Sequence, residues 1–218
     1  MRLGLGSPRC LLVIAPHPDD ETIGAYALMT RLRRRGVAVR ILVVTDGGAS
    51  HTASPTWPWQ RLIRERRCET LRAVRSLGIF RGDVTFLGLP DGRLVHEARR
   101  AHRLIEGAIR RAPKPLLVIA PSRSDDHPDH RVVAASVGFR RHACVRRLAY
   151  PVWPAGAAIR HARVVTLSAQ ERLAKRRTIR SYRTQAGRIA DDPTGFTMTR
   201  AEIAAFSRPV ETFVGQMR

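Results

Sequence analysis

Short apolar runs alternate with longer segments of helical periodicity along the first two thirds of the chain. The run Cys10–Ala15 contains no charged residue, which is typical of a strand buried on both faces. The segment Glu21–Arg35 repeats apolar residues every three or four positions and is followed by Gly36, a common helix stop. This alternation predicts strands and helices in βα order, and therefore a parallel sheet with helices on both faces.

The same patterns predict the remaining elements. Predicted strands are Val37–Thr45, Val84–Leu89, Leu116–Ala120, Arg147–Val152 and Arg163–Leu167, and predicted helices are Leu62–Leu77, Glu97–Arg111 and about Arg131–Arg141. From Ser168 the pattern changes to a long basic helix, a loop around Asp191-Asp192-Pro193 and a short helix that starts near Arg200. We therefore predict a Rossmann-like three-layer α/β sandwich with a mostly parallel central sheet and a helical C-terminal extension.

Length and composition indicate one globular domain. The 218 residues are 44% hydrophobic and 26% charged, which is ordinary globular usage. We interpret 1–218 as a single domain, with a core of about 8–167 and a C-terminal cap segment of about 168–218. No apolar run reaches the roughly 18–20 residues of a membrane span, and Cys10–Ala15 is too short for a signal peptide. Three cysteines without CxxC spacing fit reduced thiols, so we expect a cytoplasmic protein; the sequence does not indicate its oligomeric state.

The net charge of +21 raises the question of an anionic partner. All but two of the 39 basic residues are arginines, and they are spread at helix-like spacings rather than gathered in one arm. We interpret them as solvated helix faces in an arginine-rich composition, and we do not expect nucleic acid as a partner. Peripheral contact with an anionic membrane surface stays open.

Histidines and aspartates follow the ends of four predicted strands. In open parallel sheets the carboxyl ends of the strands meet at one edge, where ligands bind. The residues are His17, Asp19 and Asp20 after the first strand, Asp46 after the second, Asp91 after the third, and His127, Asp129 and His130 after the fourth.

Two of these clusters have the composition of a metal site. Two imidazoles and one carboxylate around a divalent ion, with a position left for water, are typical of catalytic zinc, although the same ligand types also bind Fe²⁺, Co²⁺ or Mn²⁺. In His17-Pro18-Asp19-Asp20, one aspartate can bind the ion while its neighbour takes a proton from water. Asp19 or Asp20 alone could instead cap the following helix, but their occurrence together with Asp126-His127-Pro128-Asp129-His130 favours a metal centre.

Both clusters also match known signatures. The segment Ala15–Glu21 (APHPDDE) resembles the (A/P)HPDDE signature of the zinc-dependent de-N-acetylases of the PIG-L/LmbE-like family, and His127–His130 (HPDH) resembles the second signature of that family. The resemblance covers roughly Cys10–Val137. It implies a zinc-dependent hydrolase that removes the N-acetyl group from an N-acetylglucosamine-type sugar conjugate through a zinc-activated water.

Position by position, the resemblance also implies roles for these residues. Asp19 looks like the general base, His127 like the partner that stabilises the oxyanion or donates a proton, and Asp129 like the carboxylate that orients His127. The implied zinc ligands are His17, Asp20 and His130.

Substrate contacts are implied less directly. Arg66 and Glu69 resemble an R-x-x-E helix feature of the family, in which Arg66 reaches a substrate hydroxyl or phosphate; the alternative is an ordinary exposed helix pair. Asp91 matches a family position near the sugar, although Pro-Asp-Gly is also a common turn. The sequence departs from the pattern at Asp125, where some members carry a tyrosine that is a candidate for polarising the amide carbonyl.

The C-terminal segment resembles the family more loosely. Lys175 with Tyr182–Gln185 resembles a K…Y-x-S-Q helix, and Phe206–Glu211 resembles a C-terminal element of bacterial members, so we expect both to cap the substrate cleft. Trp57 and Trp59 could stack on a sugar, although packing against the domain is the simpler use.

Two other functions stay open. An amidase that cleaves another amide of a sugar-thiol conjugate would use the same apparatus with a differently shaped pocket. A basic nucleotide- or nucleic-acid-binding α/β module is disfavoured, because the motif after the first strand is acidic and neither G-x-G-x-x-G nor a P-loop follows that strand.

Overall fold

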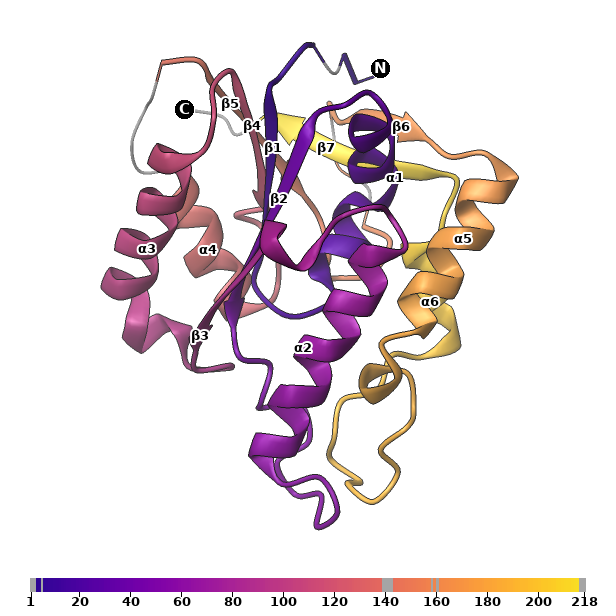
Figure 1. Cartoon of the computed structure of the whole chain (residues 1–218). Coiled ribbons are helices and arrows are strands. Elements are labelled where there is room, and N and C mark those ends of the chain that lie inside the picture. The colour runs from indigo at the N-terminus through magenta and orange to yellow at the C-terminus, as the bar shows by residue number, and fades with distance from the viewer. Residues whose placement is uncertain (1–2, 5, 139–142, 158, 160, 216–218) are drawn as a thin grey trace.

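The central feature of the molecule is a seven-stranded sheet. The computed structural model describes residues 3–4, 6–138, 143–157, 159 and 161–215. In this part of the chain the strand order is β3-β2-β1-β4-β5-β7-β6 (Figure 1). The strands are β1 (Cys10–Ala15), β2 (Ala38–Thr45), β3 (Val84–Leu89), β4 (Leu116–Pro121), β5 (Val145–Tyr150), β6 (Arg163–Thr166) and β7 (Val210–Gly215).

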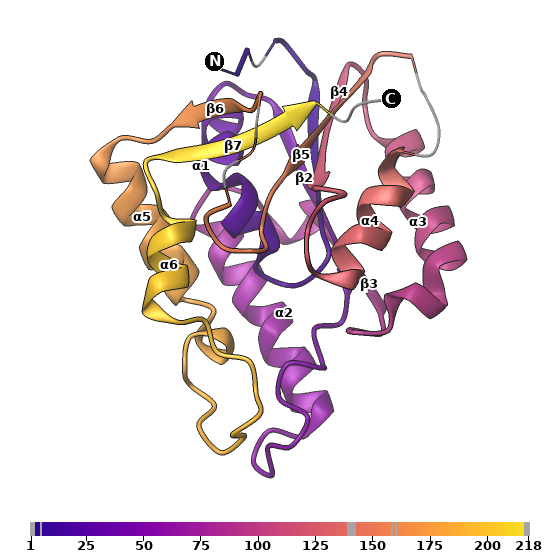
Figure 2. The same ribbon diagram turned by 180° about the vertical axis from the view of Figure 1, so that it is seen from behind.

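Helices cover both faces of the sheet. The views from the front and from behind (Figures 1 and 2) show α3 and α4 on one face and α1, α2, α5 and α6 on the other. The bounds are α1 (Asp20–Arg34), α2 (Trp59–Arg75), α3 (Ala98–Arg111), α4 (Pro128–Gly138), α5 (Ala169–Arg180) and α6 (Arg200–Phe206), with short 3₁₀ turns at Arg81–Asp83, Leu94–Glu97 and Arg183–Gln185. The end of the helix predicted up to Arg141 lies outside the described residues.

The apolar run of β1 is explained by its central place. It pairs in parallel with β2 on one side and with β4 on the other, and β3 and β5 extend the parallel sheet. Leu11 and Val13 pack into the core under α1, whereas Leu12 and Ile14 pack into the core under α3 and α4. The structure therefore confirms the predicted α/β sandwich with a mostly parallel sheet.

The C-terminal segment differs from the prediction in one respect. It contains α5 and α6 as expected, but it ends in β7, which lies antiparallel between β5 and β6 in the central sheet. The sequence predicted the helices of this extension but not its final strand, because a short strand with a charged residue, Glu211, gives little apolar periodicity. Among the helices that the structure describes, none combines the length and apolar composition needed to cross a bilayer.

Helix α1 contains a break that is held by residues of the C-terminal segment. At Ala25 the backbone leaves the helical conformation (φ −145°, ψ 20°). The Glu211 carboxylate accepts hydrogen bonds from the N–H groups of Ala27 (2.8 Å) and Leu28 (3.1 Å). Lys175 donates to the Ile23 carbonyl (2.7 Å) and to Glu211 (2.9 Å). The buried pair therefore satisfies backbone groups that the break would otherwise leave without partners.

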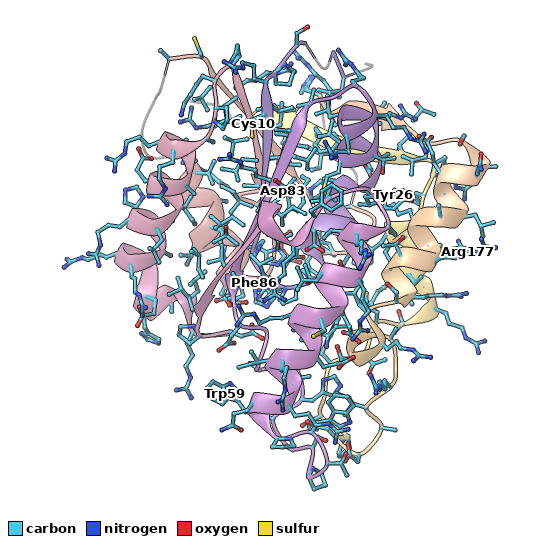
Figure 3. All side chains as sticks on the ribbon, in the orientation of Figure 1. Cys10, Tyr26, Trp59, Asp83, Phe86 and Arg177 are labelled. Atoms are coloured by element: carbon cyan, nitrogen blue, oxygen red, sulfur yellow. The ribbon has the colours of Figure 1, made fainter. Side chains whose placement is uncertain are left out.

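Trp57 and Trp59 have different environments. Trp57 is buried with Leu62 and Ile189, which supports the simpler interpretation of packing. Trp59 is 56% exposed at the start of α2, and Arg177 is exposed and points outward from α5 (Figure 3).

Candidate active site

The predicted chemistry gathers in a cavity at the carboxyl edge of the sheet. The ends of β1 and β4 lie side by side there, at the point where the chain order reverses (Figure 1). The cavity has a volume of about 300 Å³. Predicted residues that line it are His17, Asp19, Asp20, Arg66, Asp91 and His127.

Two residues that line this cavity, His17 and Asp20, form a nearly equilateral triangle of side-chain atoms with the fully buried His130. His17 Nδ1 lies 3.2 Å from Asp20 Oδ2 and 3.1 Å from His130 Nε2, and His130 Nε2 lies 3.2 Å from Asp20 Oδ2. In a tetrahedral zinc site with bonds of about 2.0–2.2 Å, neighbouring ligand atoms lie about 3.3–3.6 Å apart, close to the distances found here. These three residues are the predicted ligands, and both their donor types and their spacing fit one divalent cation.

His17 is held from its other side by two carboxylates. Its Nε2 lies 3.1 Å from Asp91 Oδ1 and 3.3 Å from Asp129 Oδ2. Burial alone would lower the pKa of His17, but Asp91, Asp129 and Asp20 outweigh burial and raise it well above its ordinary value. The carboxylates therefore favour positive charge at this place, as a metal centre requires.

Asp125 supports His130 in the same way, and the sequence analysis missed this role. The Asp125 side chain is fully buried, and its Oδ1 lies 3.1 Å from His130 Nδ1. Its carboxylate also accepts hydrogen bonds from the N–H groups of His127, Val152 and Trp153. A carboxylate on the far nitrogen of a metal-binding histidine orients the ring. The signal was present in the sequence, since Asp125 lies two residues before the second motif.

We expect Asp125→Asn to weaken metal binding about 10–100-fold. The amide keeps the size of the side chain but removes the negative charge beside His130 Nδ1, so the ring is less firmly oriented. Titration of the metal-free protein with Zn²⁺ against a competing chelator measures the change. Asp126→Asn, in the neighbouring residue, is the matched control, and equal affinities of the two variants would contradict this role.

Asp19 faces the cavity beside the triangle and is paired with Arg66. Arg66 is buried and donates from Nη2 to Asp19 Oδ2 (3.2 Å) and to the Pro18 carbonyl (2.8 Å), and from Nη1 to the Gly47 carbonyl (2.9 Å). Burial raises the pKa of Asp19 to about 8; Arg66 opposes the rise, and Asp20 adds to it. The contacts of Arg66 thus fix the predicted base. Arg66 also lines the cavity, so its expected contact with substrate stays a prediction.

His127 and Asp129 contact each other through different atoms than predicted. The main-chain N–H of Asp129 donates to His127 Nδ1 (3.2 Å). The Asp129 carboxylate instead accepts from the N–H groups of Gly92 (2.8 Å) and Leu94 (3.1 Å) and faces His17. The motif loop turns back on itself, so the carboxylate points toward the loop after β3. We had predicted that the Asp129 carboxylate orients His127. The structure shows instead that the main-chain N–H of Asp129 contacts His127.

The protonation of His127 follows from these contacts. Burial, with the charges of His17 and His130, lowers the pKa of His127 to about 4, so the ring is neutral near pH 7. Because Nδ1 accepts a hydrogen bond, the proton lies on Nε2. His127 is therefore a neutral hydrogen-bond donor in the wall of the cavity.

Two further residues that the sequence singled out, Glu69 and Asp91, form hydrogen bonds with other parts of the protein. Glu69 is buried and accepts from the N–H (3.0 Å) and the hydroxyl (2.6 Å) of Thr184, so the alternative of an exposed Arg66–Glu69 pair is wrong. Asp91 lines the cavity but also accepts from the Ala49 N–H (3.0 Å), which ties its turn to the next loop.

Two loops far apart in the sequence are joined beside the cavity. Asp191 accepts hydrogen bonds from Ser54 and Thr56, and Asp192 accepts from the Ala53 N–H. These contacts join the loop before α2 to the loop before α6. Side chains that complete the wall are Ile23, Ser50, Trp153, Gln185, Phe196 and Met198. Of the C-terminal residues expected to cap the cleft, Gln185 lines the cavity, whereas Lys175, Tyr182 and 206–211 are not among its lining residues. Phe196 and Met198, which the sequence did not single out, contribute to the wall instead.

A sequence model of the family described as PIG-L, GlcNAc-PI de-N-acetylase, matches residues 12–138, more than half of the chain. The chain belongs to the PIG-L family. The match runs from β1 to the end of α4 and includes both loops that supply the triangle.

Two curated relatives of this chain are deacetylases by name. The 1D-myo-inositol 2-acetamido-2-deoxy-alpha-D-glucopyranoside deacetylase of Kineococcus radiotolerans is 35% identical over 91 residues, which are 40% of this chain and 25% of that protein. The diacetylchitobiose deacetylase of Thermococcus kodakarensis is 31% identical over 124 residues, 56% of this chain and 45% of that protein. The chain therefore spans less than half the length of either relative.

Similarity in structure extends further along the chain. The conserved protein TT1542 from Thermus thermophilus has a TM-score of 0.66 and 28% identity, covering 95% of this chain and 94% of that one. The likeness includes most of the C-terminal segment, which the PIG-L match does not reach.

Proposed function

We propose that this PIG-L protein is a zinc-dependent hydrolase that removes the N-acetyl group from an N-acetylglucosamine-type sugar conjugate. One observation carries the proposal: His17, Asp20 and His130 form a triangle at a cavity that His17 and Asp20 line, and Asp19, which is not one of its corners, lines the same cavity. A metal site with an unbound carboxylate next to it is the arrangement needed for hydrolysis of an amide by water.

His17, Asp20 and His130 would hold the ion. A bound zinc ion supplies Lewis acidity, which polarises the acetyl carbonyl and lowers the pKa of water toward neutrality. Asp91, Asp129 and Asp125 keep the two imidazole rings in place from their far sides. Because no thiolate is present in this set, the softer metals are disfavoured.

Asp19 would act as the general base. Its carboxylate lines the cavity and is held by Arg66, so it can take a proton from the attacking water and pass it to the nitrogen of the departing amine. Its raised pKa, about 8, fits a group that carries a proton during part of the cycle. The ordering by Arg66 lowers the cost of aligning the carboxylate with the water.

His127 would stabilise the oxyanion. As the acetyl carbon becomes tetrahedral, negative charge develops on its oxygen, and a hydrogen-bond donor already aimed into the site stabilises that charge. The neutral ring presents Nε2–H to the cavity. Collapse of the tetrahedral species then releases acetate and the free amine.

The proposed substrate class is supported by the volume of the cavity and by the names of the curated relatives. A cavity of about 300 Å³ is large enough for a single amino-sugar ring. The names of the two curated relatives both describe deacetylases of acetylated amino sugars. The aromatic edge formed by Trp153 and Phe196, whose ring centroids are 5.8 Å apart, supplies an apolar surface for a sugar face.

Metal removal tests the proposal. We expect the zinc-loaded protein to release acetate and a free amine from at least one member of a panel of N-acetylglucosamine conjugates. Dialysis against a chelator should lower the rate by roughly 100-fold or more, and one equivalent of Zn²⁺ should restore it. Release of a larger acid instead of acetate would indicate the amidase alternative, and turnover that is unaffected by chelation would contradict the metal site.

A further inference from the structure

The proposed base has a strained main chain. Asp19 has φ 126° and ψ −29°, a strained conformation that a residue with a side chain rarely adopts. Such a conformation persists only where contacts around it fix it. The Asp19 carbonyl accepts hydrogen bonds from the N–H groups of Thr22 (2.9 Å) and Ile23 (3.0 Å), and the Asp19 N–H donates to Glu21 Oε2 (3.1 Å). The conformation therefore depends on the position of the Glu21 carboxylate.

Glu21 is in turn held by the C-terminal segment. It is completely buried, and its Oε1 accepts a hydrogen bond from the phenol of Tyr182. The Thr22 hydroxyl lies 2.9 Å from the same phenol oxygen. Tyr182 is 1% exposed and lies just after α5, beyond the residues that match the PIG-L family. One chain of contacts thus runs from Tyr182 through Glu21 to the main chain of Asp19.

Burying the Glu21 carboxyl group is energetically unfavourable, and efficient packing alone would not require a carboxyl group here. The groups that donate to the Glu21 carboxylate are a phenol, a hydroxyl and the main-chain N–H groups of Asp19 and Glu21 itself. Enclosing a carboxyl group among neutral donors is less favourable than filling the same space with apolar side chains. What the contacts provide is a fixed backbone at Asp19, whose carboxylate is separately held by Arg66. The base is therefore fixed at both its main chain and its side chain.

We propose that Tyr182 is a positioning residue for the hydrolysis: through Glu21 it fixes the main chain of Asp19 and so places the Asp19 carboxylate at the cavity. This inference rests on the proposed function, in which Asp19 is the base. It gives the C-terminal segment a part in the chemistry in addition to its part in the wall of the cleft.

Tyr182→Phe removes one hydroxyl and keeps the ring. We expect kcat to fall about 10–100-fold, because a small displacement of a catalytic group has an effect of this size. KM should stay within about twofold of the wild-type value, and the affinity for Zn²⁺ should not change, since the triangle is intact. The matched control is Tyr26→Phe, which removes the phenol of another buried tyrosine, one that interacts with Thr178 across the same α1–α5 contact, beyond the break at Ala25. Its kcat should equal that of the wild type.

Hydrogen exchange gives a readout that does not depend on activity. We expect the main-chain amides of the segment 16–24 to exchange roughly 10-fold faster or more in Tyr182→Phe, and at the wild-type rate in Tyr26→Phe. If Tyr182 acts through Glu21, the double variant Glu21→Ala/Tyr182→Phe should have the same kcat as Glu21→Ala. Unchanged exchange, or losses that add in the double variant, would overturn the proposal.

The outcomes separate this inference from the proposed function. A wild-type protein that hydrolyses none of the acetylated sugars overturns the proposed function and with it the catalytic part of this inference. An active wild type with Tyr182→Phe at an equal kcat overturns only the role of Tyr182. A parallel loss of kcat and of Zn²⁺ affinity in Tyr182→Phe would also overturn it, because that result indicates general damage to the site.

Discussion

Asp19→Asn should lower kcat about 10²–10⁴-fold while the protein keeps its metal. The amide has the same shape as the carboxylate and can still accept a hydrogen bond from Arg66, so the local fold should be retained. It cannot take a proton from water. Because Asp19 is not a corner of the triangle of His17, Asp20 and His130, the affinity for Zn²⁺ should stay within a few-fold of the wild-type value. Steady-state acetate release and a metal titration on the same preparation measure both quantities.

His130→Ala is the contrasting variant. It removes one corner of the triangle, so metal affinity and turnover should be lost together, and added Zn²⁺ should restore neither at the concentrations that saturate the wild type. Full activity in a correctly folded Asp19→Asn protein would show that another group takes the proton. Loss of metal in Asp19→Asn would instead place Asp19 among the ligands.

Local sequence patterns were sufficient to predict which strand ends bring the two motifs together. The uninterrupted apolar run of β1 indicates a strand buried on both sides, and a central parallel strand satisfies that pattern. The carboxyl ends of β1 and β4 must then meet, so the two motifs that follow them must meet as well. The distance of 3.1 Å between His17 and His130, which are 113 residues apart, follows from this topology.

Side-chain partners across the chain could not be predicted in the same way. The carboxylate of Asp129 faces His17 because the loop after β3 offers it two N–H groups, and a sequence does not state how that loop turns. Asp125 was visible only as a departure from a motif, since its contact with His130 depends on the turn between them. Tyr182 lies 161 residues from its partner Glu21, and no local periodicity connects two such positions.

The break in α1 also depends on contacts between residues far apart in the sequence. Gly24 lies against the ring of Tyr150, and a side chain at this position would overlap that ring. The break separates the first turn of the helix, which carries Asp20, from the longer part that packs on the sheet. Glu211 and Lys175 provide hydrogen bonds on the two sides of the break. Only 2% of the Lys175 side chain and 1% of the Glu211 side chain is exposed, so water cannot take the place of either partner.

Glu211→Ala should therefore destabilise the fold by about 3–5 kcal/mol, because it leaves the Lys175 ammonium buried without its carboxylate. For a protein of this size the loss corresponds to a decrease in Tm of about 6–20 °C. Differential scanning calorimetry measures it, with Glu65→Ala as the control. Glu65 pairs with Arg72 and Arg188, whose side chains are both exposed, and losing these surface pairs should cost about 1 kcal/mol or less. The double variant Lys175→Met/Glu211→Leu should recover part of the lost stability, since no unpaired charge remains, although Ala27 and Leu28 still lack an acceptor. Equal effects of Glu211→Ala and Glu65→Ala would show that the buried pair does not hold α1 at its break.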